Sequence, residues 1–527
     1  MKQKFSLYTS VFLLLITITS CKVGPNYQKP VVETPEVFKY EKNSLDSIID
    51  LKWWELFQDP VLDSLIYVGL KQNKDVLIAA SRINESRANL GFTKADSGPK
   101  LGVQASAGGT NFGVTDVVSG TTYKSFEASA TFNWELDFWG KYRRSNEAAK
   151  AAMLSSFYGK RMVEIGLISE IATNYFQLLN YKTSLKISEN TLEIRENALK
   201  IIQNRFDFGT TNIIDVNQAQ IQKSIAQAAI PVYKRQIAFI ENNLSVLLGV
   251  NPQNVAVNIS YEAYPFPEAI PSGIPSEILQ RRPDLLQSEQ LLRQQNALIG
   301  VATALRFPSI SLTGLLGVGS SDISNLISNG LGWGAGASLL SPLFEWGKNA
   351  RRVDIERERA NQYLLSYEKN VLLAFSDVNN ALIEISTYKN ELAAYKAMVD
   401  AASNASKLSY ERYYQGVTSY LEVIENQRQE FEAELKYSRN YQDLLISYVN
   451  LYQALGGGWI TPEELDKYAS QVANEQGVDV DPIDKETLFY QGQIVDYYLT
   501  PDQEKLRKEM AKEQRKLEKQ QRKAANN

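Results

Sequence analysis

The 527-residue chain has no histidine and a single cysteine. Without histidine there is no imidazole to act as general acid or base, no Ser-His-Asp triad and no His-ligated metal. One cysteine cannot build a disulfide framework or a thiolate cluster, and no pair of carboxylates stands out for acid–base catalysis. The net charge of −4 leaves no basic excess to neutralise nucleic-acid phosphates. We therefore expect no catalysis, no metal or other cofactor, and no nucleic-acid partner.

Glycine and proline are absent from residues 348–415. A helix of this length would be about 100 Å long at roughly 1.5 Å per residue, far longer than most globular helices. Apolar residues recur at helical spacing, but charged and amide side chains interrupt every turn or two, so no window is apolar enough to lie in lipid. We expect this helix to pack laterally against other long helices, in a rod or a tube wall.

The first twenty residues have the layout of a secretory signal, in which two lysines precede an apolar run too short to be a transmembrane helix. The run ends at Ile-Thr-Ser-Cys, which has the form of a bacterial lipobox. In that motif the cysteine, here Cys21, receives diacylglycerol and becomes the mature N-terminus. The alternative is an ordinary secretory signal with an incidental cysteine. We predict that residues 1–20 are removed and that Cys21 carries a covalent lipid, with residues 21–59 forming an anchored N-terminal segment.

An internal repeat of about 200 residues runs through the chain. Seven matches occur in order, with an offset that changes once, from 209 to 207 residues. The matches are Asn73-Lys74-Asp75 with Arg282-Pro283-Asp284, Gly91 with Gly300, Pro99 with Pro308, Gly108 with Gly317, Trp139-Gly140-Lys141 with Trp346-Gly347-Lys348, Arg205 and Gly209 with Arg412 and Gly416, and Leu248-Gly249 with Leu455-Gly456. The resulting division is a first unit at 60–249, a linker at 250–274, a second unit at 275–456 and a C-terminal extension at 457–527.

Each unit contains two segments in which apolar and small polar residues alternate, at 101–108 and 126–134 and again at 310–318 and 331–340. This alternation, with aromatic residues nearby, is typical of strands in a membrane β-barrel. Four strands are too few to close a barrel, since bacterial barrels begin at about eight. If this interpretation holds, the chain must oligomerise, and a trimer would supply twelve strands. The alternative is a four-stranded soluble sandwich.

Helices flank the strands in the same order in both units. A helix of about 35 residues comes first, at 60–95 and at 275–305. After the strands a long helix, 141–206 in the first unit and the glycine-free stretch in the second, ends at a turn and returns as an antiparallel helix. The turns contain Gly209 and Gly416, which fit left-handed C-caps. These glycines would mark the tips of two helical hairpins.

Several stretches carry a family resemblance. The most specific are Arg282-Pro283-Asp284, Gly300-Val301-Ala302 and the segment 307–312, and further ones lie at 21–30, 53–62, 413–425 and 454–459. They resemble the TolC-like outer-membrane factors, in the lipoprotein branch that serves multidrug and metal efflux. The resemblance covers about residues 21–459, and the extension beyond 460 departs from it. Within it, Arg282-Pro283-Asp284 is explained by helix-start chemistry, with Pro at the first helical position and Asp at the positive end.

The resemblance implies an α+β membrane protein of the bacterial outer membrane. Its homotrimer would combine a twelve-stranded barrel, with four strands from each chain, and a periplasmic helical tunnel of about 100 Å. The tunnel would meet a periplasmic adaptor and an inner-membrane pump, of the RND type, and act as a passive exit duct for drugs, metals or other small molecules. A structural coiled-coil envelope lipoprotein without a pore is the alternative function. The exported substrate stays open.

Acidic residues just after the tip turns are the candidate gate. Glu422 and Glu425 are spaced i, i+3 and so share a helix face; three copies would form a ring of carboxylates that favours cations and narrows a pore. They match the family's acidic tip positions. In the first unit the equivalents are Asp215 and Gln218. The alternative is that acids in a first helical turn only complement the helix dipole. For Asp215 both interpretations stand.

Overall fold

The computed structural model describes residues 22–35, 38–40, 57–111, 122–257, 275–328 and 330–457. The predicted signal peptide, Cys21, most of the linker and the C-terminal extension from residue 458 lie outside the described residues. The elements run, in order, as α2 (Pro60–Gln72), α3 (Lys74–Asp96), β1 (Lys100–Asn111), β2 (Thr122–Leu136), α4 (Lys141–Asp207), α5 (Ile213–Leu247), α6 (Pro275–Arg281), α7 (Pro283–Ala304), β3 (Ser309–Ser320), the 3-10 turn η3 (Ile323–Asn325), β4 (Gly332–Leu340), α8 (Lys348–Tyr414) and α9 (Tyr420–Ala454).

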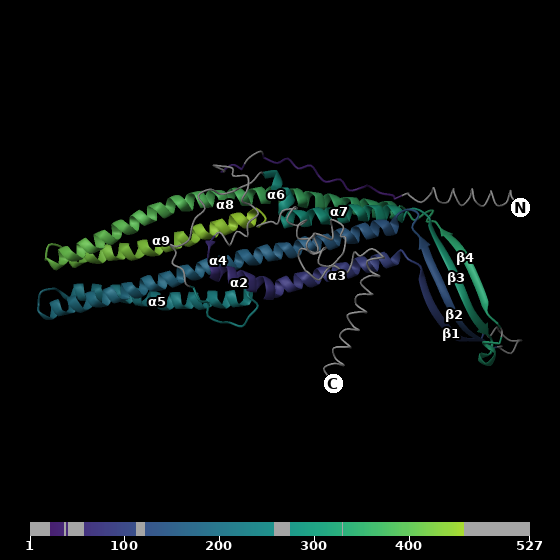
Figure 1. Ribbon diagram of the computed structural model, residues 1–527, viewed down its shortest axis with the longest axis horizontal. Coiled ribbons are helices and arrows are strands. Elements are labelled where there is room, and N and C mark those ends of the chain that lie inside the picture. Colours follow the sequence, from purple (N-terminus) through teal and green to yellow (C-terminus); the bar gives the residue numbers. More distant parts are fainter. Residues whose placement is uncertain are drawn as a thin grey trace, which may run out of the picture.

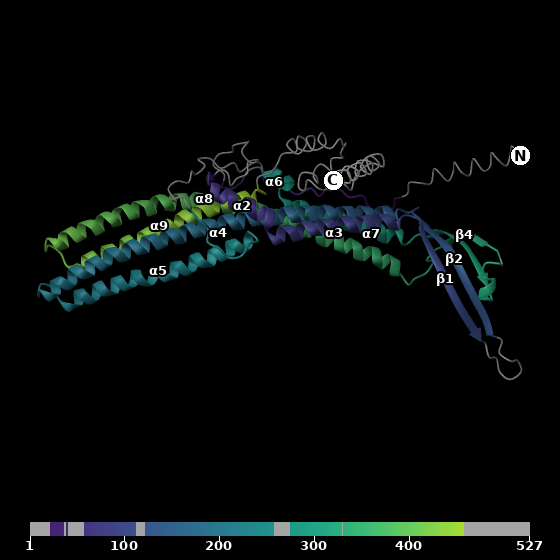
Figure 2. The same cartoon turned by 60° about the horizontal axis from the view of Figure 1, so that its bottom comes forward.

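The molecule is elongated, with the sheet at one end and two hairpin tips at the other (Figures 1 and 2). Helices α4 and α5 form the first hairpin and α8 and α9 the second. Each of the two long helices has 67 residues, which corresponds to about 100 Å. The prediction of two very long helices after the strands is confirmed.

Internal duplication is visible in the strand register. Lys100 of β1 pairs with Asn133 of β2, and Ser309 of β3 pairs with Leu340 of β4. The first residues of these pairs are 209 positions apart and the second 207, the two offsets found in the sequence. Both hairpins of the sheet therefore have one register, and the duplication is confirmed.

One sequence expectation is wrong: the first helix of each unit is broken into two. Helix α2 ends before Asn73, whose ψ of 133° leaves the helical region, and α3 starts with Asn73 as its cap. Arg282 separates α6 from α7 in the same way, with ψ at 120°, because the residue before a proline is pushed to extended backbone. Each break also holds the end of a return helix: Asn73 Nδ2 donates to the carbonyl of Leu247 at 2.8 Å, and Arg282 Nη1 to that of Ala454 at 3.0 Å.

The main hydrophobic core lies midway along the molecule, where the breaks meet both hairpins. Tyr175 of α4, Val371 of α8 and Leu445 of α9 are fully buried in it. Tyr175 donates through its hydroxyl to Asp59, the buried N-cap of α2, at 2.6 Å. Helix α2 is thereby fixed against α4 in the middle of the molecule.

Residues 22–35 form an N-terminal strap that lies along the helices toward the sheet (Figure 1). Arg144, in the first turn of α4, is fully buried and holds the strap. Its guanidinium donates to the carbonyls of Val23 and Gly24 at 3.1 and 3.0 Å and to Asn26 Oδ1 at 3.0 Å. Lys22 adds an ion pair with Glu147 at 2.5 Å. The chain just after the predicted lipidation site is therefore fixed beside the sheet.

Candidate functional site

The four strands form one antiparallel sheet in the order β1-β2-β3-β4, and its register sorts the side chains onto two faces. Phe132 lies opposite Leu101 and Gly314, and Leu312 lies opposite Ala337. Because successive residues of a strand point to opposite faces, these residues share one face, called here the outer face. Near the helices it consists of apolar residues and glycine: Leu101, Val103, Ala105, Ala107, Phe126, Ala128, Ala130, Phe132, Trp134, Leu136, Ile310, Leu312, Gly314, Leu316, Val318, Trp333, Ala335, Ala337 and Leu339. The polar residues on this face lie at the end of the sheet away from the helices: Asn111, Thr122, Lys124 and Ser320.

The inner face is dominated by serine, threonine, amides and glycine. Gln104 lies opposite Ser129, which lies opposite Gly317, and Thr313 lies opposite Gly336. Strands β1 and β4 bound the sheet, and each has one edge that pairs with no other described strand. An apolar face backed by a polar one is the pattern of a sheet that separates lipid from water.

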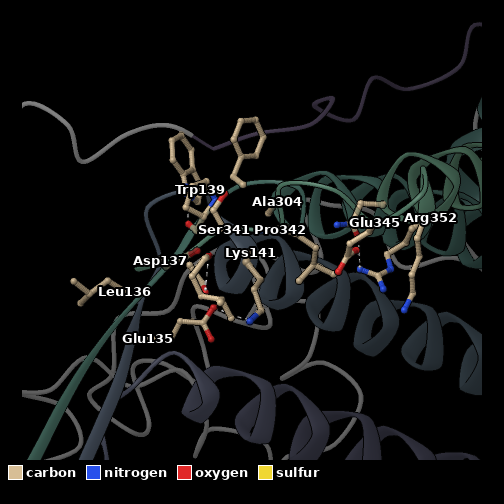
Figure 3. Close-up of a pocket in the computed structure, with 17 residues that line it drawn as sticks. Glu135, Leu136, Asp137, Trp139, Lys141, Ala304, Ser341, Pro342, Glu345 and Arg352 are labelled. Atoms are coloured by element: carbon tan, nitrogen blue, oxygen red, sulfur yellow. Dashed lines mark hydrogen bonds and ion pairs between the residues drawn. The ribbon is translucent and has the colours of Figure 1, made fainter. Parts of the chain in front are cut away.

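A pocket of about 370 Å³ marks the junction of sheet and helices (Figure 3). Glu135, on the inner face at the end of β2, accepts from Lys141 Nζ at 2.8 Å and from the Tyr142 hydroxyl at 3.0 Å. Asp137 accepts from the backbone N–H of Arg143 at 2.9 Å, as an acid at a helix N-terminus should. These bonds fix the direction in which α4 leaves the sheet.

At the opposite end of the molecule, both tips turn at a glycine. Gly209 and Gly416 have φ values of 71° and 79°, left-handed conformations that glycine adopts without strain. A threonine follows each turn and donates to the acid of the next helix: Thr211 to Asp215, and Thr418 to Glu422. Both acids stand in the first turn of a return helix.

Glu422 also closes its own hairpin. Its Oε1 accepts from Arg412 Nη1, near the end of α8, at 2.8 Å. Glu425 is exposed and pairs with Arg428 at 2.6 Å. Hydrogen bonds from Arg428 and Gln429 lower the pKa of Glu425 from 4.5 to about 2. Glu425 therefore carries its negative charge throughout the neutral and mildly acidic range.

In the first unit the equivalent arginine, Arg205, reaches across to the other hairpin. Its guanidinium lies 4.6 Å from the ring centre of Tyr413 and 5.9 Å from that of Tyr414, within cation–π range. We did not assign Arg205 or Arg412 to the tip from the sequence. The signal was present, because the two are matched in the repeat and each lies four residues before its tip glycine.

A small apolar cluster joins the hairpins just inside the tips. Tyr420 and Val423 of α9 are buried against Ile202 of α4 and Val216 of α5. The rings of Tyr413 and Tyr420 lie in contact at a tilt of 48°, with their centres 5.3 Å apart, and burial raises the pKa of Tyr420 to about 12. Tyr413 and Tyr420 therefore pack between the hairpins.

Comparison with known proteins decides the family. The model of the Outer membrane efflux protein family matches residues 65–250 and 274–457, one match in each unit. The chain belongs to this family. TtgC of Pseudomonas putida, described as a probable efflux pump outer membrane protein, is 31 % identical over 469 residues, or 87 % of this chain and 96 % of that protein.

Two further likenesses agree. SilC of Salmonella typhimurium, described as a probable outer membrane lipoprotein, is 30 % identical over 87 % of this chain and 99 % of that protein. The solved structure of the open state of the MtrE outer membrane channel of Neisseria gonorrhoeae matches with a TM-score of 0.75 and 28 % identity, over 83 % of this chain and 98 % of that one. The chain is thus an efflux channel subunit of the outer membrane.

The efflux protein's predicted site residues that the structure describes fall at one place. Gly209, Gly416, Asp215, Glu422 and Glu425 all lie at the tips, and the negative charge of Asp215 contributes to the raised pKa of Tyr420 on the other hairpin. Cys21 lies outside the described residues. No described helix is long and apolar enough to cross a membrane, and no three acidic or thiol side chains of the described residues are grouped to hold a metal ion.

Proposed function

We propose that three copies of this chain form a duct that carries small molecules from an inner-membrane pump to the cell exterior. The observation that carries the proposal is the two-faced sheet with an unpaired edge on each side, continuous with helices of 67 residues. Such a sheet exposes backbone hydrogen-bonding groups that lipid cannot satisfy. Pairing β4 of one copy with β1 of the next satisfies them and, since the strand directions alternate, keeps every pair antiparallel.

The helical tips are the proposed contact with a periplasmic adaptor, which would connect the duct to a pump of the RND type. Apolar side chains that would normally be buried lie exposed there: Phe208, Ile213, Ile214, Val417 and Leu421. Exposed apolar patches of this kind mark interaction sites. A lipid on Cys21 is proposed as the second attachment to the outer membrane, and the described lipoprotein SilC supports it.

The trimeric duct is tested by mass and by conductance. Size-exclusion chromatography with light scattering, in detergent of known mass, should give three chains per particle, and planar-bilayer recordings should give discrete single-channel currents. A monomer that opens no channel would instead support the pore-less coiled-coil lipoprotein. A confirmed trimer that gives no currents would contradict the channel and leave the trimer standing.

The gate proposal places Glu422, Glu425 and Asp215 around the three-fold axis at the tip. Replacing Glu422 and Glu425 together with Ala should raise single-channel conductance and weaken cation preference, because a ring of charge that attracts cations is lost. Glu196→Ala, which removes an exposed acid of α4 paired with Lys223, is the matched control. Unchanged conductance and selectivity in the double variant would leave these acids with a helix-capping role only.

A further inference from the structure

Three arginines are buried in the part of the chain that the structure describes, and one of them has no counter-ion. Arg144 pairs with Glu147 at 2.9 Å. Arg282 pairs with Asp284 at 2.7 Å. Arg195 of α4 is 2 % exposed, but none of the described carboxylates pairs with it. Burial lowers the pKa of Arg195, yet an arginine keeps its proton in a protein at neutral pH. Arg195 is therefore a buried charge that no opposite charge balances.

The groups around Arg195 supply only part of what water would give it. Its Nη1 donates to the backbone carbonyl of Gln222, on α5, at 2.7 Å, and its guanidinium lies 5.2 Å from the ring centre of Phe431, on α9. Its Nε and Nη2 are buried without an acceptor, and Gln222 Oε1 is buried without a donor. Buried N–H groups of an ion cost free energy when they lack acceptors. The contact involves both hairpins, because α4 and α5 form one and α9 belongs to the other.

The stretch of α4 between the main core and the tips is buried through polar residues. From Asn180 to Arg195 its buried residues are Asn180, Ser184, Ser188 and Arg195. Asn180 donates to Gln442 Oε1 at 2.9 Å and accepts from the Ser438 hydroxyl at 2.7 Å, both on α9. Water can take over such hydrogen bonds when helices part, whereas the separation of apolar residues exposes surface that water disfavours. The two hairpins are therefore joined more weakly along this stretch than at the main core or at the apolar cluster near the tips.

The internal repeat places no second charge at this level. The equivalent of Arg195 in α8 is Ala402, which is also buried, and the equivalent of Phe431 in α5 is Ser224. The charge therefore belongs to the first hairpin alone, while the ring that covers it belongs to the second. Separation of the two hairpins would remove the ring from the guanidinium and admit water to its N–H groups.

We propose that Arg195 biases the two hairpins of each chain toward separation, because its charge is unbalanced while they are packed together and hydrated when they part. The proposal rests on the gate proposed above and names a residue that opposes its closure. Arg195 lies ten residues, or about 15 Å, before Arg205 along α4. It therefore acts behind the tip and is separate from the acids of the gate.

Cysteine accessibility measures this separation in the full-length protein. Ala219 of α5 is 2 % exposed in the apolar cluster that joins the hairpins, so a maleimide should reach Ala219→Cys only when they part. Arg195→Met keeps an unbranched side chain against Phe431 and removes the charge. Labelling should become about tenfold slower, because apolar packing replaces an unbalanced ion. Arg235→Met, at an exposed arginine of α5, should leave the rate unchanged, and the chain with native Cys21 alone gives the background.

A counter-ion supplied at Gln222 gives a second test. Gln222→Glu keeps the size of the side chain and adds a carboxylate beside Arg195, so labelling of Ala219→Cys should again become slower. In the Arg195→Met chain the same change buries a carboxylate without a partner, so labelling should become faster. A change in packing alone would have the same sign in both backgrounds. The reversal of sign therefore identifies the charge of Arg195 as the cause.

Slower labelling with Arg195→Met, together with the reversal at Gln222, supports this role of Arg195. Slower labelling without the reversal overturns it. So does equal or faster labelling with Arg195→Met, because Arg195 would then hold the hairpins together through its polar contacts or a bound anion. If Arg195→Met does not fold, Gln222→Glu decides alone: slower labelling supports the role, and equal or faster labelling overturns it.

Planar-bilayer currents separate this result from the proposed duct. Unchanged labelling in a protein that gives normal single-channel currents rejects the role of Arg195 and keeps the duct. Slower labelling in a protein that opens no channel keeps the effect of Arg195 on the hairpins and rejects the duct.

Discussion

At the scale of single residues, a few buried or paired side chains decide how segments far apart in sequence are held. Arg144 is the clearest case, since a fully buried guanidinium holds two carbonyls and an amide of the strap and pairs with Glu147 at 2.9 Å. Its repeat equivalent, Arg351, has a side chain that is 83 % exposed, so identity of residue type says nothing about burial. The neighbours that each arginine meets make the difference.

Replacing Arg144 with Ala should release the strap. The change leaves the strap carbonyls without their donor and Glu147 without one partner, so we expect a loss of about 3 kcal/mol in unfolding free energy. Trypsin should also cleave sooner after Lys22, the lysine of the strap that is not followed by proline. Arg357→Ala, at an exposed arginine of α8, should change stability by less than about 0.5 kcal/mol. Equal protease resistance of the Arg144 variant and the native protein would contradict this role.

Replacing Arg428 with Gln should make cation preference sensitive to acid. In the native chain the pKa of Glu425 is held near 2. Because the folded protein favours the charged carboxylate, this group contributes to the folding free energy above pH 4.5, and the contribution is lost as the pH falls through about 2. Without Arg428 the carboxylate should protonate closer to 4.5. Reversal potentials measured between these two pH values check it, with Arg439→Gln as control, and identical titrations in all three proteins would refute the link.

At the scale of elements, hairpin ends depend on glycines whose surroundings are open. Gly209 and Gly416 have no atom within 4 Å of an added Cβ, and neither has Gly166 inside α4. Only the first two have positive φ. Conformation, and not space, therefore selects glycine at the tips.

Replacing glycine with alanine should have opposite effects on stability at positions 209 and 166. Gly209→Ala should destabilise the protein by about 1 kcal/mol, because an alanine in the left-handed region is strained. Gly166→Ala should stabilise it by roughly 0.5–1 kcal/mol, because alanine loses less entropy in a helix. Thermal unfolding of the two variants in the same detergent measures both. A shift of equal sign in the two would show that the tip turn is not held as described.

Local signals explain which elements the sequence could predict. Strand alternation, the glycine-free stretch and the glycine turns are each encoded within a few residues, and all appear in the structure. The helix breaks at Asn73 and Arg282 were missed because one non-helical residue leaves the apolar period intact on both sides. The path of the strap and the reach of Arg205 to Tyr413 depend on contacts hundreds of residues apart, which no local pattern contains.

At the scale of the whole molecule, each end performs one task. The sheet presents an apolar face with two edges to pair, and the tips present charges and exposed apolar residues. The core that joins them lies midway, where both hairpins meet α2 and α7. The duplication gives the two strand pairs of the sheet the same register.

A charge should be tolerated on one face of the sheet only. Ala105 and Gln104 are adjacent and both exposed in the single chain, but Ala105 lies on the outer face and Gln104 on the inner. Ala105→Arg should cost about 2–4 kcal/mol near the bilayer midplane and reduce the folded protein in outer-membrane fractions. Gln104→Arg should insert normally and lower cation conductance. Equal insertion of both variants would contradict the assignment of faces.

The strap finally sets how a lipid on Cys21 would behave. Its first described residue, Lys22, is tied to Glu147 and lies against Gly140 at the start of α4, and Cys21 is only about 3.8 Å farther along the chain. An acyl group on Cys21 would therefore be attached close to the start of α4. Two features would then set the depth of the protein in the membrane: the apolar band of the sheet and the lipid anchor. If a few flexible residues were inserted after Cys21, only the apolar band of the sheet would set this depth.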